Sequence, residues 1–340
     1  MDHPPALKFA GIIAAALVFA AAPAGAALPP GQVTGPEACA ECHTQEIEAW
    51  KLTSHFKTFK TMQRRPEAHD IAARLGITNI KSESLCLQCH YLSKTTDNLT
   101  EVVAGIACES CHSAAKDWVD VHADYGKGFK KETEPAEHRV ARVAKAIAGG
   151  MIRADNLYAL GANCYGCHIV TDEKLTNVGG HSAGSTGFNL LTWSQGEVRH
   201  TILHTGNKAN PAASPGHQRR LFVLGCILDV EFSFRAVARA TEKAPYAVTN
   251  ARRADAARKL LEKIQSLAPT PELAAVVEVA KAAGLRLNNS VELNAAADRI
   301  SLLGREFAAR VTDDQLAGVD GILPGPALYK GIPYKVAGQP

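Results

Sequence analysis

The chain is poor in several features that ordinary globular proteins rely on. Only 6% of its 340 residues are Phe, Trp or Tyr, although 46% are hydrophobic. This scarcity predicts that something other than aromatic side chains supplies flat apolar bulk to the core. No Lys/Arg tract, Walker motif or dinucleotide fingerprint occurs, and the formal charge is only +3. We therefore expect no nucleic-acid or nucleotide partner.

Long apolar runs are also missing, apart from one at the amino terminus. Residues 1–26 have a short start that contains Lys8, an apolar run from Phe9 to Ala22, and a small-x-small triplet at the end, Ala24-Gly25-Ala26. This pattern predicts a secretory signal peptide over residues 1–26. An uncleaved anchor is the alternative, but the run is short for a membrane-spanning helix. We expect an exported, soluble, periplasmic protein with no transmembrane segment after cleavage.

Cysteine, in contrast, is concentrated in one motif. Eight of the nine cysteines form four C-x-x-C-H motifs, which are Cys39-Cys42-His43, Cys86-Cys89-His90, Cys108-Cys111-His112 and Cys164-Cys167-His168. Chance would give about 0.01 such motifs in this composition. The motif is typical of c-type haem attachment, in which both thiols bond to the haem and the histidine is the proximal iron ligand.

The sequence therefore predicts four covalently attached haem c groups. Zinc sites, thioredoxin-like redox motifs and disulfides are weaker alternatives. A structural zinc site does not require a histidine after every second cysteine, thioredoxin-like motifs are single and lie in a βαβ context that is absent here, and disulfides are possible in an exported protein. The ninth cysteine, Cys226, lies in an apolar run and is expected to be a buried small hydrophobic residue.

Methionine is too scarce to be the second ligand of most irons. Beyond the predicted signal peptide the chain holds only Met62 and Met151. Eight histidines lie outside the motifs and the signal peptide, namely His55, His69, His122, His138, His181, His200, His204 and His217. We therefore expect bis-histidine ligation for most irons, which lowers reduction potentials relative to Met/His ligation. At least four of the eight must be non-ligands.

Spacing excludes some ligand pairs. Residues 44–62 have roughly helical apolar spacing and predict one helix that carries His55. His55 lies twelve residues after His43, and twelve helical residues rise about 18 Å. Since two ligands of one iron must lie far closer, His55 is expected to serve another haem. The same reasoning applies to His122, ten residues after His112.

Four segments resemble a known family. CAECHTQEIEAWKLTSHFKTF, LCLQCH, IACESCHSAAKDWVDVH and NCYGCH resemble, in this order, the haem segments of the cytochrome c-554 family, over about residues 36–204. Members are tetrahaem electron acceptors of hydroxylamine oxidoreductase in nitrifying bacteria. The resemblance implies an electron carrier whose partners are redox proteins, with a hydroxylamine-oxidoreductase-like enzyme among the candidates. It also implies that His55 pairs with His112, and His122 with His43.

The resemblance further implies an open, five-coordinate iron at the second haem, bound by His90. The fourth haem of the family takes a histidine well downstream of its motif, and His200 fits that position. His181 departs from the pattern, because it lies in a Gly/Ser loop thirteen residues after His168. Three alternatives stay open: His181 closes the second haem, replaces His200 at the fourth, or binds no iron.

The fold class that the sequence predicts is mainly α, a multihaem cytochrome c with haems packed among helices and loops. We predict a tetrahaem domain over residues 27–205 and a helical extension over 206–340. No alternating strand pattern stands out, and the Pro/Gly-rich end is expected to be extended or disordered. Helices are predicted at 66–76, 134–148, 218–241, 250–266, 271–283 and 290–311.

These features favour an electron carrier over an enzyme. Four haems on about 180 residues must lie close together, which suits the movement of single electrons. The alternative is a haem enzyme that uses an open second iron to reduce NO or to act on hydroxylamine. No C-x-x-C-K motif marks a specialised catalytic haem.

The motif count makes a direct prediction. Protein exported to the periplasm of a host that matures c-type cytochromes should have the mass of the processed chain plus four haems. Intact-protein mass spectrometry under denaturing conditions checks this, because thioether bonds survive unfolding. A wild-type count below four would contradict the assignment of all four motifs to haem.

Overall fold

The structure is a computed structural model that describes residues 28–185 and 187–338. The signal peptide predicted at residues 1–26 lies outside these ranges. The described residues are mainly helical, as predicted. Within them, no helix has both the length and the apolar character needed to cross a membrane.

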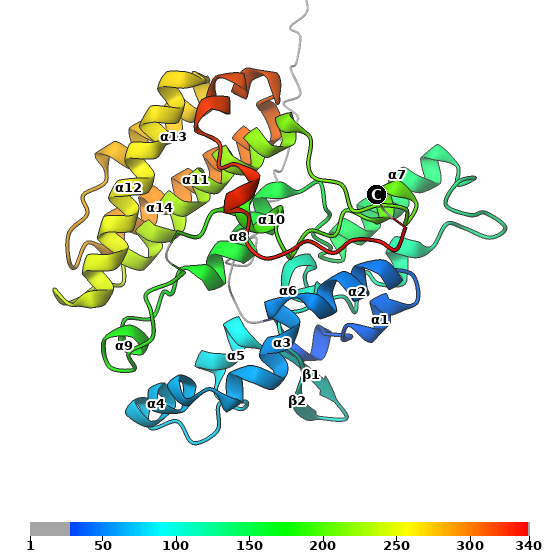
Figure 1. The fold of residues 1–340 in the computed structure, drawn as a ribbon, viewed down its shortest axis with the longest axis horizontal. Helices are drawn as coiled ribbons and strands as arrows, with labels where there is room; N and C mark the ends of the chain where they lie inside the picture. Colours follow the sequence, from blue (N-terminus) through cyan, green and yellow to red (C-terminus); the bar gives the residue numbers. More distant parts are fainter. Residues whose placement is uncertain (1–27, 186, 339–340) are drawn as a thin grey trace, which may run out of the picture.

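Short elements build the amino-terminal half, and the four C-x-x-C-H motifs lie on or beside them (Figure 1). The helices up to the fourth motif are α1 (Glu37–Ala40), α2 (Thr44–Leu52), α3 (Ser54–Thr61), α4 (Pro66–Leu75), α5 (Ser84–His90), α6 (Cys108–His112), α7 (Ala136–Ala148) and α8 (Leu157–His168). Single 3₁₀ turns are η1 (Pro30–Gln32), η2 (Met62–Arg64) and η3 (Val121–Ala123).

The single helix predicted over residues 44–62 is wrong in one respect, because it breaks at Thr53. Thr53 has an extended backbone with ψ of 158° and caps α3 by accepting a hydrogen bond from the backbone N–H of Phe56. Its hydroxyl also donates to the carbonyl of Trp50 at 2.6 Å, which closes α2. A threonine that serves both helix ends thus turns the chain between them. The break separates the segment carrying His55 from α2.

A two-stranded hairpin is the main element that the sequence reading missed. Strands β1 (Leu92–Thr96) and β2 (Leu99–Ala104) pair antiparallel. Asp97 and Asn98 join them with positive φ angles of 48° and 65°. Two consecutive residues of this kind form the type I′ turn that suits a hairpin. The sheet packs beside η1 and leads into the third motif.

The carboxy-terminal helices match their predicted positions to within a few residues at each end. They are α11 (Pro215–Val237), α12 (Pro245–Leu267), α13 (Pro271–Ala282) and α14 (Ser290–Arg310). Between α8 and α11 lie α9 (Glu173–Asn177), α10 (Leu190–Ser194) and η4 (Leu203–Thr205), and η5 (Asp314–Ile322) and η6 (Pro326–Leu328) follow α14. In Figure 1 this bundle lies on one side, α1–α5 lie on the other, and α8 and α10 lie between them.

The apolar core is distributed very unevenly. One large cluster joins α11–α14 to buried side chains of α8, including Tyr158 and Tyr165, so it crosses the predicted boundary at 205/206. Cys226 is buried in this cluster, as expected. The clusters of the amino-terminal half are small; one consists of Ala115, Trp118 and Ala146. The side chains of that half therefore form little core of their own.

The carboxy-terminal tail is extended and attached to both halves. The Lys330 N–H donates to the carbonyl of Thr192 at 3.0 Å, and the Tyr334 hydroxyl donates to Gln45 Oε1 on α2 at 2.9 Å. Val336 packs against Ala49 in a small buried cluster. Figure 1 shows this segment running from the bundle toward α2 and α7.

Close helix packing in the bundle predicts the effect of one substitution. A Cβ atom added at Gly304 on α14 would lie 2.8 Å from Tyr158 Cε2 and 3.1 Å from Ile227 Cγ2. Overpacking costs about 1–3 kcal/mol, whereas alanine gains at most about 1 kcal/mol of helix propensity over glycine. Gly304→Ala should therefore lower the free energy of unfolding, measured by urea denaturation. Asn294→Ala, at an exposed position of α14, is the control and should be neutral or stabilising.

Candidate haem sites

Four pairs of histidine rings face each other in the structure. In every pair the ring centres are 6.3 Å apart, and one ring belongs to a C-x-x-C-H motif. The pairs are His43 with His122, His168 with His55, His90 with His181, and His112 with His200. The angle between ring planes ranges from 12° in the first pair to 85° in the last.

The common separation has a simple chemical meaning. An imidazole nitrogen lies about 2 Å from a metal ion that it binds, and the ring centre lies about 1.1 Å beyond the nitrogen. Two imidazoles on opposite sides of one ion therefore have centres about 6.2 Å apart. The observed distance is thus that of two axial ligands with room for one iron between them.

The ring pairs match one ligand pair implied by the family resemblance and differ from another. His122 faces His43, as the resemblance implies. His55 does not pair with His112, because its ring faces His168, and the ring of His112 faces His200. The spacing argument holds for His55, which lies opposite a motif other than its own.

His181 also has a definite position. Its ring faces His90, so the iron position that the resemblance implies to be open has a second imidazole on its far side. His200, expected at the fourth motif, lies instead opposite the third. The Gly/Ser loop thus brings a histidine to the second motif, which was one of the alternatives that the sequence left open.

The other four histidines face no motif ring in the described residues. His69 Nε2 lies 2.9 Å from the carbonyl of Gln63. His138 Nδ1 lies 2.7 Å from Glu134 Oε1. His204 is exposed, and burial lowers the pKa of His217 at the start of α11. Of the eight histidines outside the motifs, four therefore lie opposite a motif histidine and four do not.

Motif cysteines of different sites lie next to each other. A hydrogen bond with the Cys108 thiol lowers the pKa of Cys39, and one with the Cys167 thiol lowers that of Cys89. Burial and the nearby Cys167 raise the pKa of Cys111 to about 11. These interactions place the first motif near the third, the third near the fourth and the fourth near the second.

Most of the paired rings have a fixed orientation, because Nδ1 meets an acceptor. His112 Nδ1 lies 2.8 Å from the carbonyl of Ile152, and His168 Nδ1 lies 2.7 Å from Ser185 Oγ. His122, His181 and His200 contact the carbonyls of Val119, Ser182 and Val198 in the same way. A hydrogen bond at Nδ1 leaves Nε2 to bind the metal and fixes the plane of the ring.

Burial lowers the pKa of five of the paired rings and so favours their neutral form. Burial is the main cause that lowers the pKa of His90 to about 4, and His181 adds to it. Burial, with His55 and Arg253, lowers the pKa of His168 to about 4. Burial also lowers the pKa of His43, His55 and His112. Since only neutral imidazole binds a metal ion, the folded chain favours the form that ligates.

Side chains from distant elements form hydrogen bonds with the backbone near the non-motif histidine of some pairs. Arg142 on α7 donates Nη1–H to the carbonyl of His122, and the buried Glu134 binds the other side of its guanidinium. Arg74 on α4 donates to the carbonyl of Gly179 at 2.8 Å, shortly before His181.

Asn210 forms hydrogen bonds with the backbone on both sides of His200. Its Nδ2 donates to the carbonyls of Arg199 at 2.8 Å and Tyr334 at 2.9 Å, and its Oδ1 accepts from Thr201 N–H at 3.0 Å. The sequence analysis did not identify Arg142, Arg74 or Asn210 as residues that position these segments. No local pattern marks them, because each acts on a segment 9 or more residues away.

Buried donors without partners test whether haem fits these sites. Within the described ranges, Trp118 Nε1, Trp193 Nε1 and Arg199 Nε are buried and lack a hydrogen-bond partner. Trp118 lies 5.3 Å from His122, Trp193 lies 5.2 Å from His168, and Arg199 precedes His200. An unpaired buried donor is costly. A flat apolar group that carries carboxylates would supply both bulk and acceptors, so the residues fit haem.

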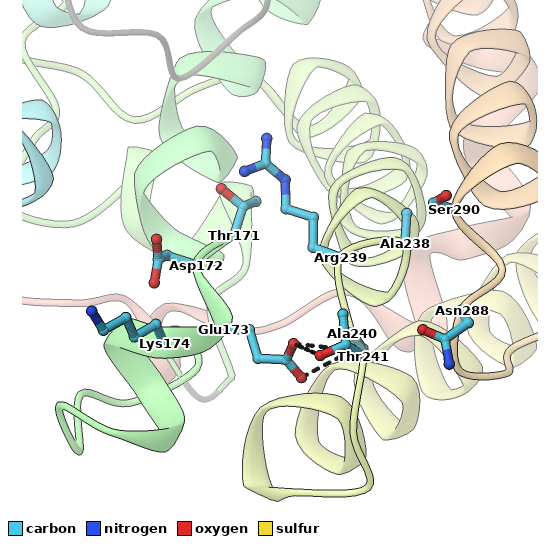
Figure 2. A pocket seen from close by; sticks show the side chains of 10 residues that line it. All are labelled: Thr171, Asp172, Glu173, Lys174, Ala238, Arg239, Ala240, Thr241, Asn288 and Ser290. Atoms are coloured by element: carbon cyan, nitrogen blue, oxygen red, sulfur yellow. Dashed lines mark hydrogen bonds between the residues drawn. The ribbon is translucent and has the colours of Figure 1, made fainter.

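A surface pocket of about 500 Å³ lies apart from the ring pairs, between α9 and the end of α11 (Figure 2). Glu173 in this pocket accepts hydrogen bonds from the backbone N–H and the hydroxyl of Thr241. Nearby, Asn177 accepts from Tyr246 N–H at 3.0 Å. These polar groups attach the segment after the fourth motif to the bundle.

Comparison with known proteins identifies relatives of the amino-terminal part. Residues 38–113, which contain the first three motifs, match the family described as cytochrome c554 and c-prime. Cytochrome c-554 of Nitrosomonas europaea is 26% identical over 105 residues, which are 28% of this chain and 45% of that protein. The match thus spans less than half of the relative. No solved structure matches the chain.

The ring pairs predict which iron each second histidine serves. His55→Ala should convert one low-spin iron to high-spin, and that iron should belong to the haem bound by Cys164 and Cys167. Low-temperature EPR measures the conversion. A Cys164→Ser/Cys167→Ser variant, shown by mass spectrometry to hold one haem fewer, identifies the low-spin signal of that haem.

A parallel Cys108→Ser/Cys111→Ser variant gives the signal that the family-derived pairing would require instead. If His55→Ala removes that signal, the ring pairing seen here is refuted. His204→Ala is the matched control, since His204 is exposed and faces no motif ring. It should leave all low-spin signals unchanged.

Proposed function

We propose that this chain, whose residues 38–113 match the cytochrome c-554 family, is a periplasmic tetrahaem electron carrier. The observation that carries the proposal is the set of four ring pairs at one separation, 6.3 Å, each joined to a C-x-x-C-H motif. Haem held in each pair supplies an iron that accepts and releases one electron.

In this proposal the chain's own residues do three things. The cysteines Cys39, Cys42, Cys86, Cys89, Cys108, Cys111, Cys164 and Cys167 hold the haems covalently. The histidines His43, His90, His112 and His168 are proximal ligands, and His122, His181, His200 and His55 are the corresponding second ligands. Contacts between motif cysteines support a row in the order first, third, fourth and second site.

The proximity of the sites supports electron transfer along the row. The main cause of the lowered pKa of Cys39 is the Cys108 thiol, and that of the lowered pKa of Cys89 is the Cys167 thiol, so the two thiols of each pair lie close together. Each of these thiols bonds to the edge of a haem, so neighbouring haem edges must also be close. The two ends of the row, at His43 and His90, are the natural points of contact with a donor and an acceptor protein.

The enzyme alternative needs an iron with an open position. His181 lies opposite His90 at the same separation as in the other three pairs. Burial and His181 lower the pKa of His90, which keeps a neutral ligand on this side as well. These observations favour a six-coordinate iron and therefore a carrier.

The decisive experiment measures spin state, ligand access and electron count together. The oxidised protein should show only low-spin ferric signals, and the fully reduced protein should bind no CO. Reductive titration should take up four electrons per chain, all returned to an added oxidant. His181→Ala is the positive control, because it should expose one iron to CO.

Binding of one CO per wild-type chain, together with a high-spin signal, would overturn the carrier proposal in favour of an enzyme. Fewer than four electrons per chain would overturn the tetrahaem assignment. Redox partners are to be sought among periplasmic proteins, with a hydroxylamine-oxidoreductase-like enzyme as a first candidate implied by the family.

A further inference from the structure

An ion pair in the carboxy-terminal bundle reaches one of the histidine pairs. Arg253 on α12 binds Asp229 on α11, with Nε 2.6 Å from Oδ1 and Nη2 3.3 Å from Oδ2. Ser233 also donates to Asp229 Oδ1 at 3.1 Å. The remaining arm of the guanidinium, Nη1, donates to the carbonyl of Ser185 at 3.1 Å. Both charged side chains are more than four-fifths buried.

Ser185 connects this ion pair to His168. Its hydroxyl oxygen lies 2.7 Å from His168 Nδ1, and its backbone N–H donates to the carbonyl of His168 at 2.9 Å. The preceding residue, Gly184, has φ of +142°, and a Cβ atom there would lie 2.6 Å from the same carbonyl. The loop thus approaches α8 as closely as backbone allows, and Arg253 holds it from the other side.

This arrangement makes His168 different from the other paired histidines. The rings of His112, His122, His181 and His200 meet backbone carbonyls at Nδ1. His168 instead meets a hydroxyl, whose direction depends on where the Ser185 backbone is held. Hydrogen bonding at Nδ1 increases the basicity of a ligating imidazole and stabilises the oxidised iron.

We propose that Arg253 is a positioning residue that acts through Ser185 to orient His168 and lower the reduction potential of the haem on Cys164 and Cys167. The inference rests on the proposed function, since it concerns the ligand of one of its haems. It assigns a role to the bundle, which contains no motif of its own. Arg253 and Asp229 lie on helices outside the segment that resembles the cytochrome c-554 family.

The test compares Ser185→Ala, Arg253→Lys and the double variant by redox titration followed with EPR. Ser185→Ala removes the Nδ1 partner and keeps the ion pair. Arg253→Lys keeps the charge but loses the planar fork that spans Asp229 and Ser185. Each single variant should change the g values of the same low-spin iron and raise its midpoint potential. The double variant should equal Ser185→Ala alone, since Arg253 acts through Ser185.

Arg252→Gln is the matched control, because Arg252 is the exposed neighbour of Arg253 on α12. It should leave the g values unchanged. Additive shifts in the double variant, or an Arg253→Lys spectrum identical to wild type, would overturn the inference. If Arg253→Lys does not fold, the Asp229→Asn/Arg253→Gln variant, which buries no unpaired charge, takes its place in the comparison.

The outcomes separate this inference from the proposed function. If the wild-type protein holds four reversible haems and the variants leave the potential and g values unchanged, only the inference fails. If mass spectrometry finds no haem on Cys164 and Cys167, the proposed function and the inference both fail.

Discussion

Two imidazoles that share one iron must lie at a fixed separation, and four pairs of histidine rings in this fold meet that requirement. Each ring pair joins a motif histidine to a ring from a distant segment, so the chain must return to every motif from elsewhere. The second rings lie on loops, turns and a short helix rather than in the bundle. Four irons held in these pairs would cross-link the amino-terminal half, whose own apolar clusters are small.

The distribution of apolar side chains explains why these closures matter. The bundle of α11–α14 has a continuous core of its own, whereas the half that carries the first three motifs has small clusters such as Val33, Leu92, Ala104 and Ala107. Few aromatic residues are available to enlarge them. Haem would supply the missing apolar bulk, and its carboxylates would meet buried donors such as Arg199 Nε. Folding of this half should therefore depend on the cofactor far more than folding of the bundle does.

Local sequence was enough to predict the motifs and the long helices, because both depend on spacing within one segment. It also excluded His55 as a partner of His43, although the helix assumed in that argument breaks at Thr53. The choice of partner depends on tertiary structure and could not be predicted in this way. The family match covers His43, His55 and His112 but ends before His168 and His200. The ring pairing therefore differs from the one that the family implies at the two sites whose motif histidine or partner lies outside the match.

The same arrangement of a carboxylate, an arginine and a backbone carbonyl occurs at two sites, one beside α7 and one in the bundle. At one, Glu134 binds Arg142, and a free N–H of the arginine holds the carbonyl of His122. At the other, Asp229 binds Arg253, and a free N–H holds the carbonyl of Ser185 beside His168. A carboxylate fixes the planar guanidinium, so its remaining donor has one direction in which to act. Arg142 on α7 and Arg253 on α12 both lie on helices, and each donates to a backbone carbonyl outside its own helix, at His122 and at Ser185.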